Sequence, residues 1–252
     1  MPRAAVTLLL AALPALAGQP LAYQDGAVKL AGYLARPASV QGPVPGVLVI
    51  HQWMGLTDHE RHTADRLAEL GYVALAADIY GAGVRPRDTR EAAAQAGIYR
   101  GDRALYRQRI KAGLDALRAQ AGVDPARLAV VGFCFGGTGA IEAARAGLPV
   151  RGVVSFHGAL DFAPDPKAAP ITAKLLVCHG ADDPTVPLQD VVAFAADMRR
   201  LKADYTFIAY SGAVHGFTQK EAGNDPSKGF AYQEAAARRS WQHMKDFFNE
   251  IF

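Results

Sequence analysis

The stretch Gly132–Phe133–Cys134–Phe135–Gly136 ends an apolar run and places a cysteine between two glycines. It has the G-x-S-x-G spacing of a nucleophile elbow, with cysteine in place of serine. Glycines at such a turn remove the Cβ atoms that would collide when a strained backbone lifts the nucleophile above a sheet. The cysteine would also stand at a helix N-terminus, where the dipole favours thiolate over thiol. Cys134 is therefore a candidate nucleophile; the alternative is a buried thiol at a packing turn.

Two phosphate-binding motifs share this richness in glycine, and neither fits. A P-loop requires Gly-Lys-Ser/Thr, whereas Gly137 is followed here by Thr138 and Gly139. A dinucleotide fold carries its glycines after the first strand, but this turn lies in the middle of the chain.

An acid and a base follow the cysteine in the order nucleophile, acid, base. The segment HGADDPTVP offers Asp182 and Asp183 after an apolar run, and SGAVHGFT places His215 in a glycine-flanked loop near the end of the chain. The spacings leave room for strand–helix units between the three, so they can meet above one sheet. This conjunction favours a catalytic Cys134 activated by His215, and from the residues alone either aspartate could orient the histidine.

An acyl-transfer site also needs donors for an oxyanion. The backbone N–H of the residue after the nucleophile, Phe135, is one expected donor. The second should come from the loop after the first core strand, where His51-Gln52-Trp53-Met54-Gly55 makes the Trp53 N–H our candidate. Trp53 as a simple apolar lid residue is the alternative.

Metal sites and disulfides have little support. The run His59-Glu60-Arg61-His62-Thr63 is one residue short of the zincin pattern H-E-x-x-H. The remaining histidines show no ligand spacing, so we expect no metal site. Cys178 ends a different apolar run from Cys134, which indicates a small core residue and no framework of disulfides.

Short apolar runs alternate with amphipathic segments along the whole chain, as in an α/β protein with a mostly parallel sheet and helices on both faces. The expected strands are 26–37, 45–51, 72–81, 127–133, 150–158, 173–180 and 203–210. The expected helices are 58–71, 89–119, 136–147, 188–202 and 232–252. In such sheets ligands bind beyond the carboxyl ends of the strands, which is where the candidate residues fall.

The first 17 residues are typical of a signal peptide. They begin with a short cationic start, continue with an apolar stretch too short to span a bilayer comfortably, and end in Ala15-Leu16-Ala17. We expect cleavage after Ala17, with an uncleaved anchor as the alternative. Residues 18–252 should then form a single domain of an exported, periplasmic or secreted protein, without a membrane span and monomeric.

Composition narrows the class of partner. Half of the 252 residues are hydrophobic and 20% are charged, with a net charge of +3. No block of five or six lysines and arginines appears, so nucleic acid is not expected as a partner. A small molecule is the expected partner.

The sequence resembles the dienelactone hydrolase family of α/β-hydrolases. The matching segments are GFCFGG, GADDPTVP, AVHGFT, HQWMGLTDH and AADIYG, in family order across nearly the whole chain. The resemblance implies an α/β-hydrolase fold of about eight strands, one of them antiparallel, and no metal or organic cofactor. It also selects Asp183 over Asp182 as the acid, through the pattern D-x-x-V-P.

Three positions depart from the enzymes that open dienelactones. Gln52 stands where those enzymes commonly carry a glutamate that helps to activate the thiol. Ala82 and Gln219 stand where two arginines hold the substrate carboxylate. Arg85 or Arg87 could substitute from a nearby loop. Loss of a charged clamp costs about 1.5–3 kcal/mol per charge-assisted hydrogen bond, so anionic lactones are not the expected substrates.

The sequence thus predicts a hydrolase of neutral carboxylic esters or lactones, working through Cys134, Asp183 and His215 and an acyl-cysteine intermediate. Candidate substrate-pocket residues are Gln52, Met54, Tyr80 and Phe217. A thioesterase or acyltransferase is the alternative among enzymes. A non-catalytic exported binding protein with this fold is the alternative from another class.

Overall fold

The structure is a computed structural model, and it describes residues 18–39, 41–163 and 165–252. These residues form eight strands and six α-helices. The strands are β1 (Gln19–Asp25), β2 (Val28–Ala35), β3 (Val44–Ile50), β4 (Val73–Ala77), β5 (Val123–Phe133), β6 (Gly152–Phe156), β7 (Lys174–Gly180) and β8 (Tyr205–Tyr210). The helices are α1 (Asp58–Glu69), α2 (Thr89–Gly101), α3 (Arg103–Arg118), α4 (Phe135–Arg145), α5 (Leu188–Arg200) and α6 (Glu234–Ile251), with 3₁₀ turns at Lys220–Ala222 and Pro226–Lys228.

All eight strands belong to one sheet in the order β1-β2-β4-β3-β5-β6-β7-β8. Strand β2 pairs antiparallel with both of its neighbours, and every pair from β4 to β8 is parallel. One strand therefore runs against the other seven. This confirms the expected α/β-hydrolase fold with about eight strands and a single antiparallel one.

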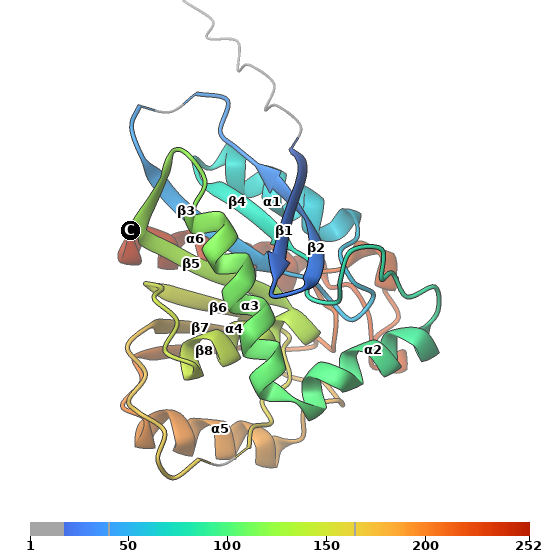
Figure 1. Cartoon of the computed structure of the whole chain (residues 1–252). Coiled ribbons are helices and arrows are strands. Elements are labelled where there is room, and N and C mark those ends of the chain that lie inside the picture. Colours follow the sequence, from blue (N-terminus) through green and yellow to red (C-terminus); the bar gives the residue numbers. More distant parts are fainter. Residues whose placement is uncertain (1–17, 40, 164) are drawn as a thin grey trace, which may run out of the picture.

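Helices cover both faces of the sheet (Figure 1). One face packs against α2, α3, α4 and α5 around large buried side chains such as Tyr106 and Phe194. The opposite face packs against α1 and α6 around residues such as Leu67 and Phe248. Because both faces are covered, β3 and β4 read as continuous apolar runs without alternation.

Two expected elements differ in the structure. The segment 89–119 is not one helix, since α2 ends at Gly101 and α3 begins at Arg103. Asp102 lies between them, and its carboxylate accepts the Leu105 N–H at 2.9 Å, which caps α3. The expected strand over 26–37 is the second arm of a hairpin whose first arm is β1, and Gly26 makes the turn with φ of 55°.

The register brings the carboxyl ends of the central strands level with one another. Ile50 of β3 lies opposite both Ala77 of β4 and Gly132 of β5. On the other side of β5, Phe133 lies opposite Phe156. The loops that follow these strands therefore meet along one edge. Within the part of the chain that the structure describes, no helix is long and apolar enough to cross a membrane.

Candidate active site

Cys134 lies at the junction between β5 and α4, and its backbone is strained. Its φ of 53° and ψ of −116° are values that L-residues rarely adopt. Its amide N–H donates to the Phe156 carbonyl at 3.0 Å and to His157 Nδ1 at 3.1 Å. These two contacts come from the end of the neighbouring strand and fix the peptide that carries the thiol. The cysteine is therefore presented at the strand end, as the sequence predicts.

The flanking glycines are required by close backbone contacts. A Cβ on Gly132 would lie 1.8 Å from the Gly136 carbonyl oxygen, and one on Gly136 would lie 2.2 Å from the Ile50 carbonyl oxygen. No side-chain movement relieves a collision with backbone. The turn thus explains both glycines of the G-x-C-x-G motif on physical grounds.

The structure brings the three predicted residues together. His215 Nε2 lies 3.0 Å from Cys134 Sγ, and His215 Nδ1 lies 2.8 Å from Asp183 Oδ2. Asp182 is exposed on the same loop and has no such contact. Geometry therefore selects Asp183, the aspartate that the family pattern indicated.

The electrostatics of this group favour a protonated imidazole. Burial opposes a charge on His215, but its hydrogen bonds to Asp183 and Cys134 outweigh that effect and raise the pKa of His215 to about 10. Burial likewise opposes a charge on Asp183, and the contacts with His215 and Thr185 outweigh it and lower the pKa of Asp183. The arrangement can hold a thiolate beside an imidazolium.

Two residues of this site were missed by sequence reasoning. Thr185 donates its N–H and its hydroxyl to Asp183 Oδ1, at 2.8 and 2.7 Å, and so aims Oδ2 at the histidine. The Asp-Pro-Thr spacing, typical of an Asx turn, was an available signal. His157 Nδ1 accepts the Cys134 N–H, so its Nε2–H donates to Thr218 Oγ1 at 2.8 Å. Its role depends on a contact between separate strand ends, which no local pattern signals.

The two expected oxyanion donors lie in the segments that follow the neighbouring strands β5 and β3. Phe135 is the first residue of α4, and Trp53 lies in the loop after β3. Neither backbone N–H donates a hydrogen bond to another described residue. The Tyr80 hydroxyl donates to the Trp53 carbonyl at 2.9 Å, which ties this loop to the end of β4.

A model of the dienelactone hydrolase family matches residues 30–252. The chain belongs to the dienelactone hydrolase family. Within it, a putative carboxymethylenebutenolidase from Synechocystis sp. is 32% identical over 88% of this chain and 92% of its own length. A probable 2-oxo-3-(5-oxofuran-2-ylidene)propanoate lactonase from Bradyrhizobium sp. is 31% identical over 87% of this chain and 88% of its own. Membership makes the chain a hydrolase of carboxylic ester or lactone bonds.

Solved structures of the dienelactone hydrolase family agree. The protein m3DLH superposes with a TM-score of 0.89 at 40% identity, covering 93% of this chain and 98% of its own. P91 from metagenomic libraries, described as a dienelactone hydrolase-like promiscuous phosphotriesterase, has a TM-score of 0.88 at 40% identity. It covers 94% of this chain and 99% of its own.

The side chains or backbone at Gln52, Gln219 and Ala82, the three positions expected to differ from dienelactone-opening enzymes, are engaged within the protein. Gln219 Nε2 donates to Gln52 Oε1, and both side chains are buried. Ala82 donates its backbone N–H to Lys29 across the sheet edge.

Neither candidate replacement arginine is free. Arg85 Nη1 donates to the Val84 carbonyl at 2.7 Å and lies 3.5 Å from Asp78 Oδ1. Arg87 forms an exposed ion pair with Glu91 at 2.6 Å. Both candidate arginines of this loop are thus engaged with an acid.

The four substrate-pocket candidates occupy different environments. Gln52 is paired with Gln219, and Met54 is half-buried in the loop after β3. Tyr80 is buried with its hydroxyl engaged by Trp53. Phe217 is fully buried on the α6 side of the sheet, so its side chain offers no surface to a substrate.

The other thiol and the zincin-like histidines lie outside this group. Burial raises the pKa of Cys178 to about 12, and both cysteines are free. His59 packs its ring against Phe133 and lines a hollow of about 440 Å³ between α1 and α6. Among the described residues, no three His, Cys, Asp or Glu side chains are placed to hold a metal ion.

Proposed function

We propose that the protein hydrolyses neutral carboxylic esters or lactones through an acyl-cysteine intermediate formed on Cys134. The observation that carries the proposal is the position of His215, which contacts Cys134 Sγ through Nε2 and Asp183 through Nδ1. A base held between a nucleophile and an orienting carboxylate is the arrangement that activates thiols and hydroxyls for acyl transfer.

In this mechanism the Cys134 thiolate attacks the carbonyl carbon, and the carbonyl oxygen takes the negative charge. The Trp53 and Phe135 N–H groups stabilise that oxyanion. As the tetrahedral intermediate collapses, the bond to the leaving oxygen breaks and the His215 imidazolium gives that oxygen its proton. A water molecule then loses a proton to His215, attacks the thioester and releases the acid. Asp183 stabilises the imidazolium and fixes its tautomer throughout.

The preference for neutral substrates rests on the pair Gln52–Gln219. An anionic substrate would bring a carboxylate to a site where two amides already satisfy each other. Arg85 and Arg87 are engaged with Asp78 and Glu91, so neither supplies the missing charge. Desolvating a carboxylate without a charged partner is unfavourable, and a neutral acyl group avoids that cost.

The test is a panel of matched neutral and anionic esters, lactones and thioesters, assayed with wild type, Cys134→Ala and the control His62→Gln on the exposed side of α1. A neutral phosphotriester belongs in the panel because P91 is described as a phosphotriesterase. We expect the control to match wild type and hydrolysis of neutral esters to vanish in Cys134→Ala. Hydrolysis that survives in Cys134→Ala overturns the mechanism, and a preference for anionic lactones overturns the substrate class.

The proposal includes export of a monomeric mature protein, supported by the sequence of residues 1–17, which lie outside the described residues. Expression in a Gram-negative host should give periplasmic protein whose intact mass begins at Gly18. Its elution in size-exclusion chromatography should match a single chain. Retention of residues 1–17, or a dimeric mass, would contradict these two expectations.

A further inference from the structure

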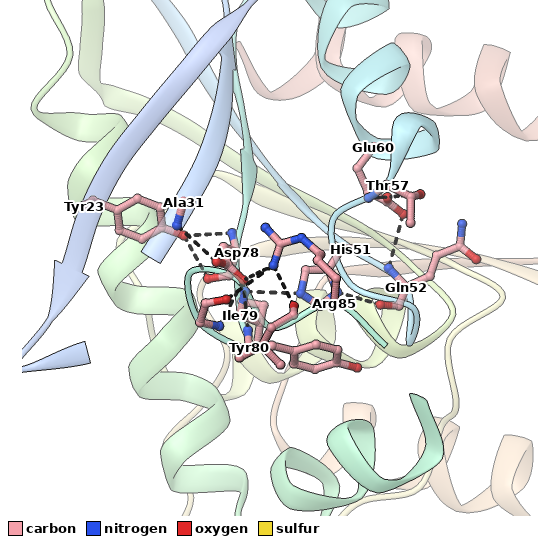
Figure 2. A network of polar contacts seen from close by, with 12 residues as sticks. Tyr23, Ala31, His51, Gln52, Thr57, Glu60, Asp78, Ile79, Tyr80 and Arg85 are labelled. Atoms are coloured by element: carbon pink, nitrogen blue, oxygen red, sulfur yellow. Dashed lines mark hydrogen bonds and ion pairs between the residues drawn. The ribbon is translucent and has the colours of Figure 1, made fainter. Parts of the chain in front are cut away.

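Three consecutive peptide groups in the loop after β3 are each held by a different side chain. Figure 2 shows the contacts of Glu60 and His51 with Gln52. Glu60 on α1 accepts the Gln52 N–H at 3.3 Å. His51 Nδ1 contacts the Gln52 carbonyl at 2.6 Å, and the Gly55 N–H donates to the same carbonyl at 3.1 Å. The Tyr80 hydroxyl donates to the Trp53 carbonyl at 2.9 Å. The Trp53 N–H stands between these fixed points and makes no hydrogen bond to another described residue.

The tautomer of His51 follows from its two partners. The Ile79 N–H donates to Nε2 at 3.2 Å, so Nε2 carries a lone pair. In a neutral ring the proton then resides on Nδ1, which donates to the Gln52 carbonyl. His51 thus bridges the end of β4 to the loop after β3 with one accepted and one donated hydrogen bond.

His51 and the two rings that pack against it are buried. His51 has no exposed surface, and its ring packs against Tyr80 at 4.6 Å and Phe135 at 5.9 Å between centroids. Burial, outweighing nearby Glu60 and Asp78, lowers the pKa of His51 and keeps the ring neutral. Phe135, the other expected oxyanion donor, is therefore packed against the same imidazole.

The partner of Nε2 is fixed as well. Asp78, at the end of β4, is fully buried and accepts N–H groups from Ala31, Tyr80 and Gly81 at 3.1 to 3.2 Å. Its carboxylate ties the turn that carries Ile79 N–H and the Tyr80 ring to β2 (Figure 2). Through Asp78, β2 therefore helps to set the positions of the His51 ring and the Tyr80 hydroxyl, the two groups that hold the loop after β3.

The Gln52 carbonyl and the Trp53 N–H are the two ends of one planar peptide unit. A donor that fixes the carbonyl therefore fixes the direction of the N–H, and it polarises the amide so that the N–H becomes a stronger donor. We infer that His51 is a positioning residue for the oxyanion hole, orienting the Trp53 N–H through the Gln52 carbonyl, with Tyr80 holding the following peptide. The inference rests on the proposed acyl transfer at Cys134.

The test compares two amides that replace different halves of the imidazole. In His51→Asn the side-chain amide reaches the level of Nδ1 and keeps a donor for the Gln52 carbonyl. In His51→Gln it reaches the level of Nε2 and keeps an acceptor for the Ile79 N–H only. We expect His51→Asn to retain most of kcat and His51→Gln to lose about tenfold or more, approaching the roughly 10²-fold loss of deleting an oxyanion donor. KM for the ester should change little in both.

Alkylation of Cys134 by iodoacetamide distinguishes a misoriented Trp53 N–H from a general disturbance of the site. The reaction needs the thiolate, but it forms no oxyanion. We expect labelling rates of His51→Gln and His51→Asn to equal that of wild type. Tyr80→Phe, which removes one hydroxyl from the same loop, should lower kcat several-fold with unchanged labelling, and it tests the inference if His51→Gln fails to fold.

Equal kcat in His51→Gln and His51→Asn overturns the inference, as does labelling that falls in step with kcat, or a Tyr80→Phe enzyme with the kcat of wild type. Failure of the underlying proposal looks different, because Cys134→Ala would then retain ester hydrolysis. If hydrolysis by wild type depends on Cys134 but His51→Gln keeps full kcat, only the positioning role of His51 is rejected and the proposed function stands.

Discussion

Gln219 donates a side-chain N–H to Oε1 of Gln52, joining two loops whose residues are 167 positions apart in the sequence. One residue follows the base His215 by four positions, and the other directly precedes the candidate oxyanion donor Trp53. The link therefore joins the loop after β3 to the segment that follows His215 through two buried neutral amides. A substrate that approaches Cys134 meets no charge from this pair.

Gln219→Arg should shift selectivity toward anionic substrates. A guanidinium beside the acyl site gives a substrate carboxylate a charge-assisted partner, worth about 1.5–3 kcal/mol. The ratio of kcat/KM for a carboxylate-bearing lactone to that for its methyl ester should rise by about tenfold or more. Gln219→Met is the control, since it breaks the amide pair without adding charge and should leave the ratio near that of wild type. An unchanged ratio in folded Gln219→Arg contradicts our account of the substrate class.

Asp183→Asn should impair both catalysis and thiol activation. Without the carboxylate, the pKa of His215 falls and the imidazolium that pairs with the thiolate is lost. We expect kcat to drop by about 10²-fold or more, because without this carboxylate the His215 ring can also adopt the wrong tautomer. Iodoacetamide labelling of Cys134 at neutral pH should slow, because the imidazolium that pairs with the thiolate is lost. Asp182→Asn, on the exposed neighbour, is the matched control and should behave as wild type; a similar loss in both variants would show that the loop, not the carboxylate, matters.

The sequence predicts the fold and the three central residues because both follow from local patterns. Alternating apolar runs and helices mark a parallel sheet, and the cysteine, acid and base each lie in a glycine-rich loop after a strand. Asp183 could not be separated from Asp182 without the family pattern, because either spacing reaches the histidine. The break within 89–119 could not be predicted from the sequence. Gly101 ends α2 and Asp102 caps α3, but neither residue interrupts the sequence pattern that predicts one continuous helix.

Contacts between buried polar groups that lie far apart in the chain could not be predicted from the sequence. Glu60 carried a local signal, because Thr57-Asp58-His59-Glu60 has the spacing of a capping box, and the Glu60 carboxylate does accept the Thr57 N–H at 2.8 Å. Its second contact, with Gln52 N–H, depends on where the loop after β3 folds back. The same holds for His51 and His157, whose roles arise only when neighbouring strand ends come level.

Gly132→Ala should prevent stable folding, whereas Gly97→Ala should not. A Cβ at Gly132 would lie 1.8 Å from backbone of the α4 turn, so β5 and α4 would have to separate. We expect a loss of more than about 3 kcal/mol in the free energy of unfolding, in the range of severe core mutations. Gly97 lies inside α2 with nothing within 4 Å of a new Cβ, and alanine there should stabilise the helix by about 0.5–1 kcal/mol. Urea unfolding of both variants checks this, and an equally stable Gly132→Ala protein would contradict the elbow geometry.

The protein should lose stability between pH 7 and pH 5 because buried histidines stay neutral. Burial, with a smaller effect from His215, lowers the pKa of His157 well below its usual value. As pH falls below about 6.5 the unfolded chain binds a proton there and the native state does not, so the free energy of unfolding decreases. The loss reaches about 2 kcal/mol at pH 5 for one such histidine, at 1.36 kcal/mol per pH unit. His51, whose pKa is also lowered by burial, acts in the same direction.

His157→Asn should remove part of this pH sensitivity while keeping the elbow supported. The asparagine oxygen can accept the Cys134 N–H in place of Nδ1, and asparagine tolerates the φ of 40° found at this position. The difference in unfolding free energy between pH 7 and pH 5, measured in urea, should shrink by up to about 2 kcal/mol relative to wild type. His62→Gln, at an exposed position of α1, should leave that difference unchanged. Equal pH sensitivity in His157→Asn and wild type would mean that His157 takes up its proton in the folded protein.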